Sequence, residues 1–359
     1  MCFRMITLNV KRKVCSVHGL NVYKITVTSF VGLCVAVVIS TFTLQLSIKY
    51  DIRTKPLTDI CNDVEQEYTL SNNTNTTSSR RQINCILCFR HNFHFLIQND
   101  RICKLYSSNQ SVELIVLIMT THNNTNERMA LRTTWLSYTK NNTANVRYAF
   151  LLGEIDDNKS KEAVLKENSV YHDIIKEDFI DNYLNLTYKT IMGFKWASTK
   201  CSHAHYVMKT DDDMFVNIQR VLNICKGNHS KTLQKAIIGD CHIKACPVRD
   251  QSSKWFASVD SYPEKFYPGY CSGTGYVTSM RVAKKIYKIS PNVPFFHLED
   301  VYVSLCIQKL GLKLQPMSGF NAGPPFMDPC VYQEDKVITV HQVPPETLKS
   351  MWNGKCILK

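Results

Sequence analysis

An α/β domain with a largely parallel central sheet is the fold class that this sequence predicts. From residue 112 onward, apolar runs of strand length alternate with polar segments of helix length. This alternation is typical of parallel strands joined by crossover helices. Residues 112–359 are also enough for one domain with a sizeable core. The sequence has no internal repeat, which excludes a repeat architecture.

Three largely apolar runs predict buried strands. Residues 112–119 are the first, because a short apolar run followed by a polar turn is typical of a strand buried on both faces. Residues 146–152 form a second run, which ends at Gly153. The third run covers residues 206–210 and leads directly into three acidic residues.

Helices are expected around these strands. After a polar turn at residues 120–126, Arg128 and Arg132 are four residues apart and therefore share one face of a predicted helix. Residues 159–168 predict a polar helix, and residues 186–202 predict a longer one. The order of strands and helices agrees with a layered α/β domain.

The first 48 residues have the pattern of a signal anchor. Residues 1–24 hold five basic residues and no acidic one, and residues 25–48 carry no charged side chain. As a helix, the second segment would be about 36 Å long, enough to cross a bilayer core. The basic flank predicts a cytosolic tail over residues 1–24 and a single-pass type II topology, with the rest of the chain in the secretory lumen. A cleaved signal peptide is the alternative, with an unusually long charged region.

Cysteines and glycosylation sequons support a lumenal location. Past the predicted anchor the chain keeps 12 of its 15 cysteines, an even number that permits disulfides in an oxidising compartment. Their spacing leaves the pairing open. Sequons matter only for a chain that enters the secretory pathway. The eight Asn-x-Ser/Thr sequons begin at Asn72, Asn75, Asn109, Asn123, Asn141, Asn158, Asn185 and Asn228.

Residues 49–111 predict a lumenal stem, because their polar centre cannot bury enough apolar area to fold alone. Within this segment Cys85, Cys88, His91 and His94 recur at every third position, and all four are possible zinc ligands. Structural zinc sites usually separate two pairs of ligands by a loop, so this spacing is atypical of zinc. Oxidation of the two thiols in the lumen is the alternative.

The chain is basic, with a net charge of +13, and five of its basic residues precede the predicted anchor. A moderately basic lumenal domain suits anionic partners such as a nucleotide sugar or an acidic glycan. Nucleic acid is excluded as a partner by the predicted compartment and by the lack of basic runs interleaved with aromatic residues.

Asp211, Asp212 and Asp213 follow the third predicted strand and form the strongest candidate for a functional site. Clustered carboxylates beside a core are costly unless a cation neutralises them, and a hard divalent cation with oxygen ligands is the usual partner. A metal at the end of a strand, open on one side, is suited to binding a diphosphate. A solvated acidic turn is the alternative interpretation.

Two segments in the carboxyl half also indicate a site. Residues 267–276 are rich in aromatic residues and glycine, which favours close approach of the backbone to a ligand or tight packing. Glu299 and Asp300 lie between apolar flanks. Partial burial raises the pKa of a carboxyl group and suits it to act as a general base. Asp300 can equally cap a helix that begins near Val301.

Five motifs occur in order over residues 112–345. They are Arg128-x-x-x-Arg132-x-Thr-Trp135, Asp181-x-Tyr-x-Asn-Leu-Thr-x-Lys-Thr190, Tyr206-x-Met-Lys-Thr-Asp-Asp-Asp-x-Phe-Val216, Tyr267-Pro-x-Tyr-Cys-Ser-Gly-Thr-Gly-Tyr276 and Glu299-Asp-Val-Tyr-Val303. In register and behind a predicted signal anchor, they resemble the β1,3-glycosyltransferases of carbohydrate-active family 31. The resemblance is greatest to the β1,3-galactosyltransferase branch of that family.

The resemblance implies a GT-A-like catalytic domain over residues 112–359, an inverting reaction and a place in the Golgi membrane. UDP-galactose or UDP-N-acetylglucosamine would donate its sugar to the 3-hydroxyl of a glycan acceptor on a protein or lipid. The expected acceptor ends in GlcNAc or GalNAc. Residues 271–275 and 181–183 favour galactose. A β1,3-N-acetylglucosaminyltransferase and a non-catalytic membrane lectin are the alternatives. The lectin is expected to lose the acidic motifs, and this chain keeps them.

The resemblance also implies roles for individual residues. Asp213 would be a direct Mn²⁺ ligand, Asp211 would contact both metal and nucleotide, and Asp212 would complete the motif that binds the donor. His341 resembles a C-terminal histidine that completes the metal site, with a purely structural histidine as the alternative. Asp300, which forms an acidic pair with Glu299, would be the catalytic base.

Five more residues have roles that the sequence leaves open. Arg128 and Arg132 would reach the diphosphate or the uridine of the donor, or else stabilise the fold. Lys209 would contact the nucleotide or balance the negative charge beside it. Trp255 and Tyr276 would stack on sugar faces, or else pack in the core.

Overall fold

The computed structural model describes residues 14–17, 20–23, 85–321, 323, 328–333 and 336–356. The chain divides into two units, Met1–Thr54 and Lys55–Lys359. In the first unit, β1 (Val14–Val17) pairs antiparallel with β2 (Leu20–Tyr23). The predicted anchor at residues 25–48 lies outside the described residues, as does most of the predicted stem. Among the helices that are described, none is both long and apolar enough to cross a bilayer.

The second unit is built on an eight-stranded sheet, with strand order β11-β9-β10-β7-β4-β5-β6-β3. Its three central strands cover the predicted apolar runs, because their side chains are buried on both faces. In chain order the strands are β3 (Phe95–Ile97), β4 (Leu114–Met119), β5 (Val146–Glu154), β6 (Ile174–Ile180), β7 (Tyr206–Asp211), β9 (Ala236–His242), β10 (Tyr270–Ser279) and β11 (Lys313–Pro316).

The sheet is mixed rather than largely parallel. Strands β4, β5, β6 and β7 are parallel to their neighbours in this group, as the alternating pattern predicts. Strand β10 runs antiparallel to both β7 and β9, and β3 runs antiparallel to β6. The antiparallel strand β10 was not predicted from the sequence. It contains the aromatic and glycine-rich segment, and its glycines interrupt the apolar pattern that would indicate a strand.

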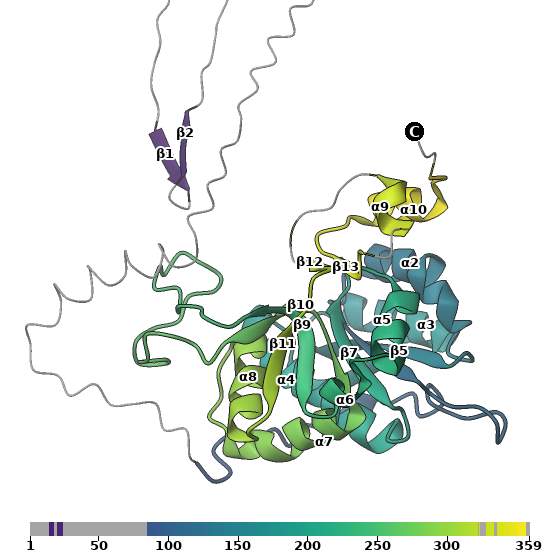
Figure 1. The fold of residues 1–359 in the computed structure, drawn as a ribbon, viewed down its shortest axis with the longest axis horizontal. Helices are drawn as coiled ribbons and strands as arrows, with labels where there is room; N and C mark the ends of the chain where they lie inside the picture. Colours follow the sequence, from purple (N-terminus) through teal and green to yellow (C-terminus); the bar gives the residue numbers. More distant parts are fainter. Residues whose placement is uncertain are drawn as a thin grey trace, which may run out of the picture. The chain divides into compact units, whose positions relative to one another are not determined.

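Helices cover both faces of the sheet (Figure 1). Helices α4, α7 and α8 pack in one hydrophobic cluster, whereas α2, α3, α5 and α10 pack in the cluster on the opposite face. The helices are α2 (Thr125–Thr133), α3 (Asn158–Tyr171), α4 (Leu186–Lys200), α5 (Ile218–Lys226), α6 (Ser230–Leu233), α7 (Met280–Ile289), α8 (Glu299–Lys309), α9 (Pro329–Gln333) and α10 (Pro345–Asn353).

A small second sheet pairs strands from the chain's C-terminal part with a strand that follows β7. Its order is β12 (Phe320–Asn321), β13 (Thr339–Val340) and β8 (Phe215–Val216). Because β13 pairs with β8, which directly follows the three aspartates, the residue after β13 lies beside the end of β7. Figure 1 shows β12 and β13 above the large sheet.

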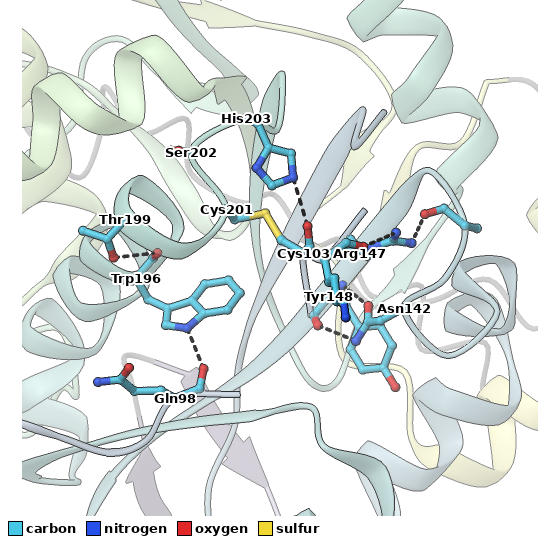
Figure 2. Close-up of a disulfide and its surroundings, with 12 residues drawn as sticks. Gln98, Cys103, Asn142, Arg147, Tyr148, Trp196, Thr199, Cys201, Ser202 and His203 are labelled. Carbon is cyan, nitrogen blue, oxygen red and sulfur yellow. Dashed lines mark hydrogen bonds between the residues drawn. A yellow bond between two sulfur atoms is a disulfide. The ribbon is translucent and has the colours of Figure 1, made fainter. Parts of the chain in front are cut away.

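Residues 85–111 pack on the folded unit, so the domain extends further toward the N-terminus than residue 112. Strand β3 forms an edge of the large sheet, and Phe89 is buried. Figure 2 shows the disulfide between Cys103 and Cys201, which ties this segment to the end of α4. Beside it the Trp196 indole donates a hydrogen bond of 2.7 Å to the carbonyl oxygen of Gln98.

The Cys-x-x-Cys pair in this segment does not form part of a zinc site. Cys85 and Cys88 are joined in a disulfide, so neither sulfur is a thiolate. The His91 ring is hydrogen-bonded to Ser290, and the His94 ring lies 3.3 Å from the Asp178 carboxylate. Further disulfides join Cys241 to Cys271 and Cys330 to Cys356, so part of the even set of cysteines past the predicted anchor is paired.

Candidate active site

The three aspartates lie where β7 ends, at the carboxyl edge of the parallel strands. Asp211 is the last residue of β7 and is paired in register with Met119, the last residue of β4. In open α/β sheets the crevice beyond this edge is the usual position of a ligand. Asp212 and Asp213 form the turn that leads into β8.

Asp211, Asp213 and His341 form a candidate metal site. One ligand atom from each lies within 4.8 Å of the others, and the His341 Nε2 atom is 3.3 Å from the Asp213 Oδ2 atom. The main chain holds the two segments together, since the Val343 amide donates a 2.9 Å hydrogen bond to the Asp213 carbonyl oxygen. Two carboxylates and an imidazole are a donor set that fits a divalent cation such as Mn²⁺.

Asp212 has a different environment from its two neighbours. Its Oδ2 atom accepts hydrogen bonds from the Thr120 hydroxyl at 2.6 Å and from the Asn124 amide at 2.9 Å. Burial, with a smaller contribution from the neighbouring aspartates, raises the pKa of Asp212 to about 6. The structure therefore gives Asp212 the role of fixing the loop after β4 against the turn after β7.

Lys209 links the aspartates to the acidic pair on α8. Its Nζ atom is 2.8 Å from an Asp211 carboxylate oxygen and 2.9 Å from Glu299 Oε1, and it donates to the Gly273 carbonyl oxygen. Burial lowers the pKa of Lys209, but the charges of Asp211 and Glu299 outweigh burial and raise it above its usual value. Since only 3% of the Lys209 side chain is exposed, the structure supports the charge-balancing role.

Gly273 makes this arrangement possible. A Cβ atom at Gly273 would lie 2.3 Å from Glu299 Oε1 and 3.3 Å from Lys209 Nζ, so a larger residue would collide with the buried ion pair. The glycine-rich sequence in β10 is thus explained by close packing of the backbone against charged side chains.

Glu299 and Asp300 begin α8, yet their environments differ. Glu299 is buried, with one oxygen beside Lys209 and the other accepting from the Thr190 hydroxyl at 3.0 Å. Burial, followed by the charge of Glu299, raises the pKa of Asp300 to about 7, although a hydrogen bond from the Val301 amide opposes this shift. The helix is capped at Leu298, so Asp300 is in the first turn of α8 and is not its cap.

The aspartates, Lys209 and the acidic pair on α8 line three adjoining cavities. The first is lined by Asp211, Asp212, Asp213 and His341 together with residues 119–123. The second, the central cavity, shares Asp211 and His341 with the first and is also lined by Lys209 and Asp300. The third lies beyond Asp300 and shares Trp255 with the central cavity. Two residues of the metal-site candidate, Asp211 and His341, therefore line the same central cavity as the candidate base Asp300, and the adjoining cavities share lining residues with it. We refer to these three cavities together as the cleft.

Two further residues line the cleft, Tyr183 from the motif at residues 181–190 and Lys254, which the sequence analysis did not single out. Tyr183 and Lys254 both border the first and the central cavities, and the Lys254 ammonium lies 4.9 Å from the centroid of the Trp255 ring. Burial and the charges of Asp300, Asp211 and Glu299 raise the pKa of the Tyr183 hydroxyl to about 12. Lys254 lies in an irregular segment without periodicity, so no sequence pattern identified it.

The two candidate aromatic residues have different positions. Trp255 lines the central and third cavities and is 50% exposed, which is compatible with contact to a sugar. Tyr276 is 1% exposed and packs in the cluster formed with α4, α7 and α8. Of the two alternatives for Tyr276, the structure shows packing in the core.

Arg128 and Arg132 do not line the cleft. The Arg128 guanidinium is fully buried; it forms an ion pair with Glu167 at 2.6 Å and donates to the carbonyl oxygen of Thr121 at 2.5 Å. Arg132 pairs with Glu167 at 2.7 Å and with Asp173 at 2.8 Å. Their donors point to partners inside the protein, so a structural role replaces the predicted contact with the donor.

Another ion pair explains the motif at residues 181–190. Lys189 pairs with Asp181 at 2.7 Å and donates to the Thr120 carbonyl oxygen at 2.7 Å. The second oxygen of Asp181 accepts from the Gly153 amide at 2.8 Å. These contacts join the ends of β4, β5 and β6, and they shape the wall of the first cavity.

Comparison with known proteins identifies the family. A family model described as Galactosyltransferase matches residues 126–318. Beta-1,3-galactosyltransferase 1 of Mus musculus is 43% identical over 265 residues, covering 73% of this chain and 78% of the relative. Beta-1,3-galactosyltransferase 5 of Homo sapiens is 36% identical over 244 residues, covering 67% of this chain and 77% of the relative.

Two solved structures are also similar. The galactosyltransferase LgtC in complex with donor and acceptor sugar analogs has 11% identity and a TM-score of 0.34, and the likeness covers 64% of this chain and 87% of that one. The apo structure of the WbbM bifunctional glycosyltransferase has 10% identity and a TM-score of 0.39, with 70% and 51% covered. At these scores neither adds to the assignment.

The chain belongs to the galactosyltransferase family, and it is a glycosyltransferase. The resemblance to β1,3-galactosyltransferases of family 31, which rests on five motifs, is thereby confirmed. The family model spans all five of these motifs, and its match begins at residue 126, in the first turn of α2.

Proposed function

We propose that this chain is an inverting, metal-dependent β1,3-galactosyltransferase that moves galactose from UDP-galactose to the 3-hydroxyl of a glycan acceptor. One observation carries the proposal: Asp211, Asp213 and His341 converge, and two of them, Asp211 and His341, line the same cavity as Asp300. The names of the relatives, which are β1,3-galactosyltransferases, support galactose as the transferred sugar.

The donor's diphosphate fits beside the metal-binding residues. Asp211, Asp213 and His341 would hold Mn²⁺, which when bound offsets the negative charge that develops on the departing diphosphate. Lys254 adds a positive charge to the lining of both the first and the central cavities. The uridine end of the donor would then lie in the first cavity, beside residues 119–123, in a GT-A-like arrangement.

Asp300 supplies the base. With a pKa of about 7, its carboxylate is a better proton acceptor than an ordinary aspartate and is still largely ionised above neutral pH. Asp300 takes the proton of the acceptor's 3-hydroxyl while that oxygen forms a bond to the anomeric carbon. The bond from the anomeric carbon to the diphosphate oxygen breaks with its electron pair, which leaves with UDP. Attack from the face opposite UDP inverts the anomeric centre.

Glu299 positions the base and does not act as a second base. Its carboxylate is buried, and each of its two oxygens already contacts a side chain of the protein, Lys209 or Thr190. The negative charge of Glu299 still contributes to catalysis because it raises the pKa of Asp300.

Transfer of N-acetylglucosamine from UDP-N-acetylglucosamine is the second candidate function, because the acidic triplet at residues 211–213 is compatible with either donor. We further propose a Golgi location with type II topology, supported by the disulfides and by the sequence pattern of residues 1–48.

The test incubates the full-length chain, purified in detergent, with Mn²⁺ and either UDP-galactose or UDP-N-acetylglucosamine. Acceptors are simple β-linked GlcNAc, GalNAc and Gal glycosides, and the linkage of each product is determined by NMR. We expect β1,3-linked galactose, abolished by chelation and by Asp300→Asn. Transfer of N-acetylglucosamine instead would establish the second candidate. The absence of both transfer and hydrolysis with both donors would overturn the proposal.

A further inference from the structure

A fourth cavity lies where β7 begins, away from the cleft. It encloses about 570 Å³ and is lined by the start of β7, by the loop before that strand and by one face of α7. Strand β7 runs from Tyr206 at this cavity to Asp211 at the candidate metal site, a rise of about 16 Å, since a strand rises about 3.3 Å per residue. Figure 1 shows α7 at the end of the unit opposite to β12 and β13. The cavity is therefore separate from the site of the proposed reaction.

The lining of this cavity is basic. Four cations come from α7, at positions i, i+3, i+4 and i+7, and residues at these spacings share one face of a helix. They are Arg281, Lys284, Lys285 and Lys288. Two histidines of the loop before β7, His203 and His205, line the same cavity. Among the described residues that line it, none is acidic.

The four cations of α7 are not neutralised inside the protein. Within the part of the chain that the structure describes, none of them forms an ion pair, and two carboxylates from neighbouring segments have other partners. Asp100 pairs with Lys200 at 3.0 Å. Glu113 lies 3.3 Å from His205 and 3.7 Å from Lys226. The positive charge of this helix face is therefore directed to solvent.

Such a helix face is unfavourable by itself. Helix α7 contains no acidic residue, and Arg281 lies in its first turn, where the positive end of the helix dipole disfavours a cation. Like charges three and four residues apart also repel one another. The apolar face of α7 is already used, since Val282, Ala283 and Ile286 are buried in the core. A charge pattern that departs from local preference without a gain inside the fold is typical of a functional site, and here it indicates an anionic partner.

The surroundings of the basic face favour a sulfated glycan over other polyanions. Entry into a lipid surface requires exposed apolar side chains, whereas Tyr206 and Met280, the larger apolar residues of the lining, are buried. Acidic peptides commonly extend a free sheet edge or lay apolar anchors in a groove, whereas β7 is paired on both sides, with β4 and β10. A sulfated glycan has dense charge and no apolar side chains, so cations and hydrogen-bond donors are sufficient to bind it.

We propose that the basic face of α7 and the cavity beside it form a binding site for a sulfated glycan chain. Its sulfate groups pair with the four cations, which extend over about 10 Å of the helix because each residue rises about 1.5 Å. Clustered lysines and arginines are a known pattern of heparin-binding surfaces. This site has no part in sugar transfer and does not rest on the proposed function. Its role is to hold the protein on a polyanionic glycan while the cleft stays free.

The test measures binding of a heparin dodecasaccharide to the full-length chain in detergent by titration calorimetry at several salt concentrations. The same oligosaccharide without its sulfate groups should bind at least about tenfold more weakly. The α7 variant, Arg281→Gln/Lys285→Gln/Lys288→Gln, removes three cations and keeps Lys284, which donates to the Ser202 carbonyl oxygen at 3.0 Å and supports the fold. Because a polyanion releases condensed counterions as its charges are neutralised, the slope of log K against log salt should fall by about 2–3 in this variant, with at least about tenfold weaker binding.

The matched control is Lys140→Gln/Lys159→Gln/Lys166→Gln, which removes the same charge at exposed lysines that do not line the cavity. It should change the affinity for heparin less than about threefold, because distant surface charges are screened at physiological salt. Both variants should unfold at the Tm of the wild-type chain, a check of the fold that needs no enzymatic activity.

Four outcomes decide the inference. Unchanged binding by the α7 variant, an equal loss in the control variant, or no binding by the wild-type chain would overturn the site. Tighter binding of polyglutamate, of single-stranded DNA or of nanodiscs that contain phosphatidylserine, compared with heparin, would overturn a sulfated glycan as its ligand. None of these measurements involves turnover, so the site and the proposed transfer reaction can each fail without the other.

Discussion

Replacing Asp300 with asparagine should remove activity and, at the same time, stabilise the fold. Asparagine keeps the size of the side chain and the oxygen that accepts the 2.8 Å hydrogen bond from the Val301 amide. It cannot accept a proton from the acceptor hydroxyl, and loss of general-base catalysis typically lowers the rate by about 10²–10⁴-fold. Binding of UDP is expected to be nearly unchanged.

The stabilisation follows from the raised pKa of Asp300. The pKa rises from 3.8 to about 7 on folding, because burial and the charge of Glu299 disfavour the carboxylate. About three pH units correspond to an upper limit of about 4 kcal/mol, and since Asp300 borders water-accessible cavities we expect about 2–4 kcal/mol.

The sign of the pH dependence follows from proton binding. Between pH 4 and pH 7 the folded wild-type chain binds more protons at Asp300 than the unfolded chain does, so its stability falls as the pH rises. The advantage of Asp300→Asn should therefore be absent below about pH 4, grow up to about pH 7, and remain constant above it.

Thermal unfolding of both chains from pH 4 to pH 8, together with initial rates of transfer, measures both effects. For a domain of this size each kcal/mol corresponds to roughly 2 °C or more in Tm, so a difference of several degrees is expected at pH 8. A Tm difference that does not depend on pH, or near-normal turnover of Asp300→Asn, would refute the reasoning. Glu299→Gln serves as a contrast, because it breaks a buried ion pair and should destabilise the fold at pH 8.

Three further predictions concern the metal site, a buried arginine and a disulfide. His341→Ala removes one of three converging ligands, so the rise in Tm on adding Mn²⁺, followed by a thermal shift assay, should need at least about tenfold more metal; an unchanged titration would exclude His341 as a ligand. Arg128→Met leaves Glu167 with one fewer partner in a buried network and should cost about 3–5 kcal/mol in denaturant unfolding, with an unchanged KM for the donor; a raised donor KM without a loss of stability would restore the donor-contacting role. Replacing both Cys103 and Cys201 with alanine opens a loop of 98 residues and should lower the free energy of unfolding by about 2–5 kcal/mol relative to the oxidised wild-type chain; equal stability of the variant and the oxidised wild-type chain would contradict this role of the disulfide.

The central strands were predictable because burial on both faces leaves a continuous apolar run in the sequence. Predicted runs at 112–119, 146–152 and 206–210 correspond to β4, β5 and β7. The helix predicted at 186–202 corresponds to α4. Strand β6 was not identified, because its buried lysine and glutamate interrupt the apolar run. Those charged residues are buried through pairing with side chains from other elements, which local sequence does not show.

The candidate site was predictable to the extent that its chemistry is contained in short motifs. The acidic triplet and the acidic pair at 299–300 were found as sequence patterns, and both border the cleft. The division of labour within each motif was not predictable. Asp212 and Glu299 differ from their neighbours only in which groups of distant segments they contact, namely Thr120 and Asn124 in one case and Lys209 in the other.

The sequence by itself determined the α/β class, the family and the list of carboxylates, because apolar periodicity and motif residues are local properties of the chain. The tertiary structure decided which of the charged residues work in the cleft. Arg128 is four residues from Arg132 and belongs to a motif, yet folding turns its guanidinium inward to Glu167. Lys254 belongs to no pattern, yet folding brings it to the cleft. A charge acquires its role from the partners within a few ångströms, and those partners come from segments far apart in the sequence.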